Sequence, residues 1–73
     1  MPYHVKTPGK LEVGDSLEVN ARIRYRQPLQ KSTLHRTKKA LYITFDKFQS
    51  SITPGQFVAW YEKEELLGSG IIA

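Results

Sequence analysis

The segment LEVNARIRYR, residues 17–26, decides how this chain folds, because apolar and polar side chains alternate along its whole length. Alternation with a period of two is typical of a β-strand with one buried and one solvated face. The apolar set is Leu17, Val19, Ala21, Ile23 and Tyr25, and the opposite set is Glu18, Asn20, Arg22, Arg24 and Arg26. We therefore expect a strand over residues 16–26 with a row of three arginines on its outer face.

Those arginines form a possible track for a polyanion. Alternate residues of a strand lie on one side at intervals of roughly 6.5 to 7 Å, close to the phosphate spacing along a nucleic-acid strand. Pro28 removes a ladder donor and biases Gln27 toward an extended backbone. We expect the strand to stop there, which places the motif RYRQ, residues 24–27, at a rim of the sheet.

Further short segments of strand character follow at a spacing of about ten residues. They cover residues 29–35, 40–45, 56–61 and 65–72. Residues 36–39 are expected to form the basic tip of a hairpin, and Pro54-Gly55 has the residues of a type II turn. A helix over residues 60–67 is the weaker alternative, because it is short and lacks an N-cap residue.

These segments predict an all-β fold, a small closed antiparallel β-barrel of about six strands. Closure removes the exposed edges that an open sheet of 73 residues could not hide. We assign residues 1–15 to a lead-in segment and residues 16–73 to the barrel domain.

Composition favours an anionic partner. The net charge is +4, and residues 1–39 carry nine Lys or Arg against three acids, whereas residues 40–73 carry two against four. Such polarised basic charge favours nucleic acid, although it also serves solubility and steering. No apolar stretch approaches the roughly 20 residues of a membrane span, and the chain has no cysteine. We expect a cytoplasmic protein without a membrane partner.

No constellation of residues indicates catalysis or a metal. His4 and His35 lie far apart in the sequence without further ligands at metal spacing. Glu62, Glu64 and Glu65 are typical of a solvated turn and not of a general acid and base, because the sequence around them offers nothing that would desolvate one of them. Gly68-Ser69-Gly70 lacks the Lys and Ser or Thr of a phosphate loop, and its small residues favour close backbone approach inside a barrel.

Several motifs together resemble a known family. They are ARIRYRQP (residues 21–28), ITPGQ (52–56), Trp60-Tyr61 and LGSGII (67–72). In order and spacing they are similar to the carboxyl-terminal β-barrel of bacterial tRNA-specific 2-thiouridylases, over residues 16–72. The chain departs from that family's pattern in two places. Glu62-Lys63-Glu64 stands where an Asp-Gly turn is usual, and Leu66 stands where a cysteine precedes three glycines.

The resemblance implies a barrel of the translation-factor and aminomethyltransferase type within a larger enzyme. That enzyme, a tRNA-uridine 2-sulfurtransferase, activates the wobble uridine with ATP and places sulfur at C2. It implies an upstream PP-loop ATPase domain and a central domain as partners, with catalytic residues and ATP belonging to those domains. For this fragment it implies tRNA binding, no catalytic residue and no cofactor.

The resemblance also implies that Arg24, Tyr25 and Gln56 touch tRNA. We add Arg22, Arg26 and Gln27 as neighbouring candidates. Tyr25 fits a core-facing aromatic equally well, and Gln56 fits a residue that binds its own turn. A structural or protein-docking barrel with incidental basic charge is the alternative function, since fold does not fix function.

Overall fold

The computed structural model describes residues 2–6, 12–24 and 27–73, and the described residues form six β-strands. These are β1 (Tyr3–Lys6), β2 (Ser16–Arg22), β3 (Gln30–Arg36), β4 (Leu41–Phe45), β5 (Phe57–Glu62) and β6 (Glu65–Ile72). No helix in this described part is long and apolar enough to cross a bilayer. The expected all-β class is confirmed.

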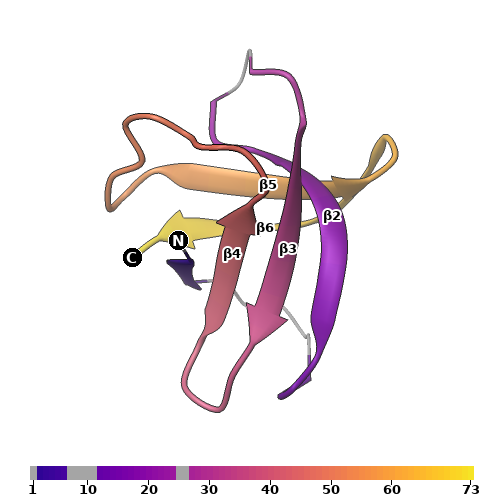
Figure 1. Ribbon diagram of the computed structural model, residues 1–73, viewed down its shortest axis with the longest axis vertical. Coiled ribbons are helices and arrows are strands. Elements are labelled where there is room, and N and C mark those ends of the chain that lie inside the picture. Colours follow the sequence, from indigo (N-terminus) through magenta and orange to yellow (C-terminus); the bar gives the residue numbers. More distant parts are fainter. Residues whose placement is uncertain (1, 7–11, 25–26) are drawn as a thin grey trace.

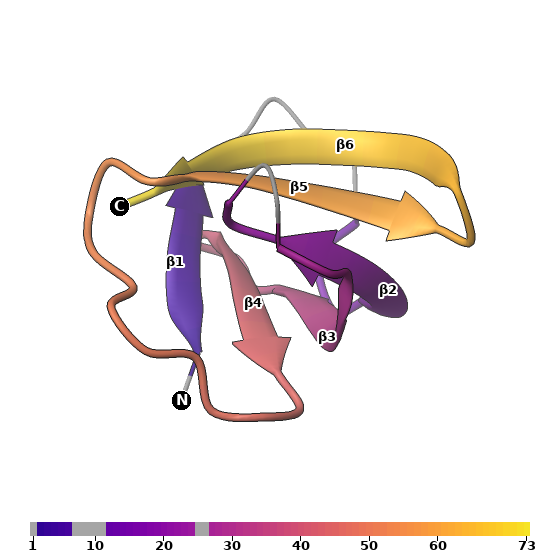
Figure 2. The ribbon, with the colours of Figure 1, turned by 90° about the horizontal axis from the view of Figure 1, so that it is seen from above.

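The strands close into an antiparallel barrel in the order β1, β4, β3, β2, β5, β6, with β6 pairing back to β1. In Figure 1 β2, β3 and β4 run side by side, and the β5–β6 hairpin crosses them. Viewed from above, β1 lies between β4 and this hairpin (Figure 2). The expected closed barrel is therefore confirmed.

The barrel interior is filled by the inward residues of every strand, as the period-two pattern predicted. The buried cluster is Val5, Val19, Ala21, Ile23, Leu34, Leu41, Ile43, Phe45, Val58, Trp60 and Ile72. Leu17, at the start of β2, is exposed instead. Three consecutive residues of β5, Val58 to Trp60, are buried, so both faces of this strand are covered, as its apolar sequence indicated.

β2 ends at Arg22, so the expectation of a strand reaching residue 26 is wrong. The Gln27 amide donates to the Arg24 carbonyl at 3.0 Å, which closes a turn. The Gln27 side-chain Oε1 accepts from the Ile23 amide at 3.0 Å, so this amide bonds to a side chain and not to a backbone carbonyl of a neighbouring strand. The chain therefore leaves the ladder four residues earlier than the alternation suggested, and Arg24 lies in the β2–β3 connection.

β1 lies within residues 1–15, which the sequence assigned to a lead-in segment. It pairs with β4 through Tyr3 to Val5 and with β6 through Val5 and Lys6. Val5 is buried in the core, so this short strand closes the barrel. The preceding proline and the following Thr-Pro-Gly obscured a strand of only four residues.

The expected turns agree with the backbone. Gly55 has a φ of 93°, and the Gln56 amide donates to the Thr53 carbonyl at 3.3 Å, as a type II turn at Pro54-Gly55 requires. Lys38 and Lys39 lie exposed at the tip of the β3–β4 hairpin, whereas Arg36, also expected there, is the half-buried last residue of β3. Residues 60–67 form no helix, because β5 turns at Lys63 and returns as β6.

Gly68 is required by the large side chain that it faces. It pairs with Trp60 at a register shift between β5 and β6. A Cβ at position 68 would lie 2.8 Å from Trp60 Nε1 and 3.0 Å from two ring carbons. The expectation that the small residues permit close approach inside the barrel is therefore confirmed at this position.

Gly68→Ala should lower the free energy of unfolding by about 1 to 3 kcal/mol, because the added methyl overpacks a buried indole. Urea denaturation of the variant measures the change. In a Trp60→Phe background the same substitution should cost clearly less, since the ring is smaller. An equal cost in both backgrounds would show that the Trp60 contact is not the cause.

Candidate nucleic-acid interface

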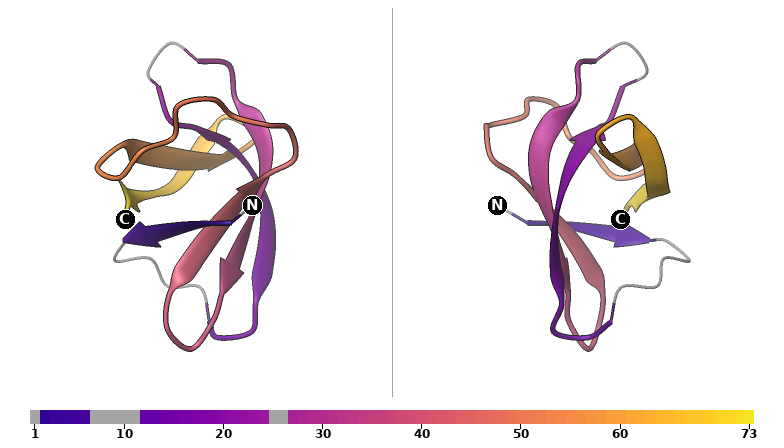
Figure 3. Two further views of the ribbon diagram at one scale, coloured as in Figure 1. Left: turned by 60° about the vertical axis from the view of Figure 1, so that its left-hand side comes forward. Right: turned by 90° about the vertical axis from the view of Figure 1, so that its right-hand side faces the viewer.

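Two connections lie toward one end of the barrel and carry the candidate residues. They are the β2–β3 connection, described at residues 23–24 and 27–29, and the β4–β5 connection, residues 46–56. Both lie opposite the β3–β4 hairpin in the views of Figures 1 and 3. β2 pairs with β5 up to Arg22 and Ala59, so the antiparallel register brings the chain around Arg24 toward Gln56.

Arg24 presents an exposed guanidinium group. One of its nitrogens, Nη2, donates to the Ser50 carbonyl across a long 3.4 Å hydrogen bond. Among the described residues no carboxylate pairs with it, so its charge is not neutralised there. A guanidinium has five N–H donors in a planar fork, and most of those of Arg24 stay available for a phosphate.

Gln27 connects the two loops. Its Oε1 accepts from the Ile23 amide at 3.0 Å, and its Nε2 donates to Gln49 Oε1 at 2.9 Å. Gln49 in turn donates to the Lys47 carbonyl at 3.1 Å. Each functional atom of Gln27 thus makes one bond within the protein, and these bonds position the loop that carries Arg24, while the expected contact of Gln27 with tRNA stays a prediction.

Gln56 uses one end of its amide to hold its own turn. The Thr53 amide donates to Gln56 Oε1 at 2.9 Å, and because the partner is an N–H, the facing atom must be the oxygen. The turn is also fixed against β6, since the backbones of Gly55 and Gln56 bond to Ile72. Gln56 Nε2 makes no hydrogen bond to a described residue, so it can still donate to a ligand.

Arg22 is partly buried and has a partner on another strand. Its Nη2 donates to the Tyr61 hydroxyl at 3.0 Å, and its guanidinium carbon lies 5.1 Å from the centre of the Tyr61 ring. This stacked contact supports the outer side of the β2–β5 pair. Arg22 therefore does not extend the row in which Arg24 was expected. Tyr25 and Arg26 lie outside the described residues.

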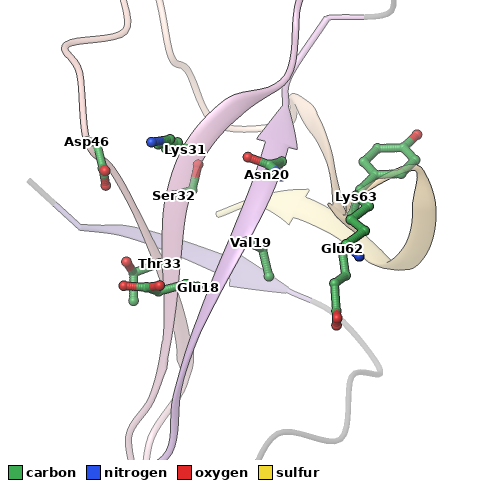
Figure 4. A pocket seen from close by; sticks show the side chains of 10 residues that line it. Glu18, Val19, Asn20, Lys31, Ser32, Thr33, Asp46, Glu62 and Lys63 are labelled. Atoms are coloured by element: carbon green, nitrogen blue, oxygen red, sulfur yellow. The ribbon is translucent and has the colours of Figure 1, made fainter.

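A depression of about 420 Å³ lies on the outer surface between β2, β3 and the β5–β6 turn, and its lining includes Tyr61, the partner of Arg22, and Asp46 of the β4–β5 connection. Figure 4 shows Glu18, Asp46 and Glu62 around it together with Lys31 and Lys63. Acidic groups outnumber basic ones, so this depression does not attract a polyanion. The described residues contain no cluster of three or more His, Asp or Glu side chains that could hold a metal.

The remaining sequence candidates lie apart from the interface. Lys38 and Lys39 are exposed at the opposite end of the barrel. His4 stacks against Tyr42 at 5.6 Å between ring centres, and His35 Nδ1 lies 3.2 Å from the Ser16 hydroxyl. The structure thus joins Arg24 and Gln27 to residues 49–50 of the β4–β5 connection, which also carries Lys47, and it leaves Lys38 and Lys39 in the β3–β4 hairpin.

Sequence reasoning missed Gln49, Ser50 and Tyr61 as partners of the candidate residues. Their contacts join segments 22 to 39 residues apart, and no local pattern reveals such pairing. Phe48 gave the one usable signal, because it is a large apolar residue between polar ones and outside any strand pattern.

Comparisons with known proteins agree with this architecture. The chain matches the family described as aminomethyltransferase beta-barrel domain over residues 3–72. It belongs to this family of small barrel domains.

The particular proteins that it resembles are tRNA-specific 2-thiouridylases, named MnmA. The protein from Flavobacterium johnsoniae is 61% identical over 71 residues, which is 97% of this chain and 18% of the relative. The protein from Christiangramia forsetii is 57% identical, covering 86% of this chain and 16% of the relative. A more distant one from Streptococcus uberis is 47% identical, covering 78% of this chain and 15% of the relative. The chain thus spans less than a fifth of these relatives, and the kinship inferred from its motifs is confirmed.

Gln27→Ala should release the β2–β3 loop, because the Ile23 amide loses its acceptor and Gln49 its donor. We expect faster hydrogen exchange at the Ile23 amide and a loss of about 1 kcal/mol in unfolding free energy. Gln27→Glu is the matched control, since its carboxylate still accepts from Ile23. Equal exchange in the two variants would contradict a positioning role for the Gln27 oxygen.

Proposed function

We propose that this chain is the tRNA-binding barrel of a longer tRNA-specific 2-thiouridylase. The observation that carries the proposal is the exposed Arg24 guanidinium, which pairs with no described carboxylate and is bonded to Ser50 in the β4–β5 connection. The similarity to enzymes named for a tRNA substrate supports it. A cation on a fixed loop, free of internal ion pairs, is suited to contact phosphates without a large cost of ordering.

Each candidate residue has a distinct role in this proposal. Arg24 binds a phosphate through its fork, and Gln56 Nε2 donates to a phosphate or sugar oxygen. Gln27 holds the Arg24 loop through Ile23 and Gln49. Arg22, held by Tyr61, adds positive potential near the site rather than a direct contact.

The chemistry of the parent enzyme lies outside this chain in the same proposal. ATP would activate the wobble uridine in an upstream PP-loop domain of a cytoplasmic enzyme, and sulfur would be added there with the help of a central domain. The glycine-containing segment here does not fit ATP phosphates, because residues 68–70 belong to β6 and Gly68 faces Trp60. The barrel binds the tRNA and orients it.

A docking role receives support from a different surface. The β5–β6 hairpin exposes four large apolar side chains, Phe57, Leu66, Leu67 and Ile71. Phe57 and Ile71 are direct partners across the two strands, so they form one patch. In this role the remainder of the longer protein covers the patch, which adjoins Gln56 of the proposed RNA site.

Arg24→Ala should weaken tRNA binding by this chain and make it less sensitive to salt. The slope of log K against log salt should become shallower by about 0.9 if one duplex phosphate contact is lost. Fluorescence anisotropy of labelled tRNA at several salt concentrations measures both quantities.

Lys39→Ala is the matched control, because it removes the same charge from the far end of the barrel. Amide chemical shifts should move at Arg24 and Gln56 during the tRNA titration. Equal effects of the two substitutions, with no shifts at these amides, would instead favour the docking function.

A further inference from the structure

Phe48 is the most exposed large apolar residue described by the structure. It lies in the β4–β5 connection with 90% of its surface accessible. Scattered surface hydrophobes are ordinary in proteins, so exposure alone assigns nothing. Its position is informative, because the loop is held by hydrogen bonds on both sides of Phe48.

The loop around Phe48 is fixed on both sides. Before it, the Asp46 amide donates to the Lys31 carbonyl at 3.0 Å. After it, Gln49 bonds across to Gln27 and also back to the Lys47 carbonyl. Ile52, a little further on, packs against the barrel core. The phenyl ring therefore projects from a restrained backbone, which lowers the ordering cost of binding through it.

The same hydrogen bonds place the aromatic residue beside the cation. Arg24 reaches the Ser50 carbonyl, two residues beyond Phe48, and Gln27 reaches Gln49, the next residue. A phosphate-binding fork and an apolar ring thus belong to one connected pair of loops. RNA offers both complementary groups within one nucleotide, a phosphate and a planar base.

We propose that Phe48 stacks on an unpaired base of the RNA whose backbone Arg24 contacts. The inference rests on the proposed tRNA-binding function. It adds to that function a base-contacting residue and a preference for unpaired bases. Bases in a duplex are stacked on one another and present only their edges, whereas loops and single strands can place a base face on an aromatic ring. The site is therefore selective for unpaired RNA.

Phe48→Trp provides a direct optical test, because an exposed indole is quenched when a base stacks on it. Trp60 is only 4% exposed and contributes a background that the unmodified chain supplies for subtraction. Titration with a short unstructured RNA oligonucleotide should quench the added indole, and an RNA duplex of equal length should quench it far less. Val13→Trp is the control, since Val13 is 56% exposed in the turn before β2. Equal quenching by strand and duplex, or equal quenching at position 13, would overturn the inference.

Affinity gives an independent measure. Phe48→Leu keeps an apolar side chain but removes the flat ring, and it should weaken binding of the single-stranded oligonucleotide by roughly five- to a hundredfold. Binding of the duplex should change little. Because the side chain is exposed, the variant is expected to fold normally, and its unfolding curve checks this.

The outcomes separate this inference from the proposed function. If Arg24→Ala weakens RNA binding while Phe48→Leu does not, stacking is excluded and the tRNA-binding function stands. If neither the single-stranded oligonucleotide nor the duplex binds to the unmodified chain, both the stacking inference and the proposed tRNA-binding function are wrong. That result would favour a contact of Phe48 with another protein domain.

Discussion

A chain of 73 residues buries only about 60 to 65% of the surface that its unfolded form exposes, so this domain depends on pairing every strand on both sides. The four residues of β1 complete that pairing between β4 and β6. Trp60 fills the interior where Gly68 leaves room for its indole. Because the strands are committed to closure and to the core, the groups free to meet a partner lie mostly in the connections.

Local patterns were sufficient to predict five of the six strands but not where β2 ends. Alternation in β2 and the Pro54-Gly55 turn each reflect chemistry within a few residues, and both were recognised from the sequence. The end of β2 at Arg22 was not, because the Gln27 side chain competes with the ladder for the Ile23 amide. β1 was too short to show a pattern. The contact of Arg22 with Tyr61 joins residues 39 apart and depends on the barrel itself.

The candidate site also differs from the expected row of arginines, because its side chains contact residues that are distant in the sequence. An extended row of arginines would have offered similar charges at equal intervals. The structure instead gives the described candidates different roles, since Arg22 stacks on Tyr61, Arg24 is exposed with one bond to Ser50, and Gln27 joins two loops. Gln56 divides its amide between its turn and the outside. All four residues make side-chain hydrogen bonds within the protein, which leaves recognition to their remaining donors.

If the barrel binds RNA as proposed, net charge alone cannot select which of its ends makes the contact. Cations lie at both ends, with Arg24 near one and Lys38 and Lys39 at the other. The molecule is 31 Å long, and charges further apart than about 8 to 10 Å are largely screened at physiological salt, so the two ends attract a polyanion almost independently. Of these two ends, the described structure shows a cation joined to an exposed aromatic ring through a hydrogen-bonded loop pair only around Arg24. Orientation on RNA would then follow from short-range geometry at that end, with the overall positive charge serving mainly to speed encounter.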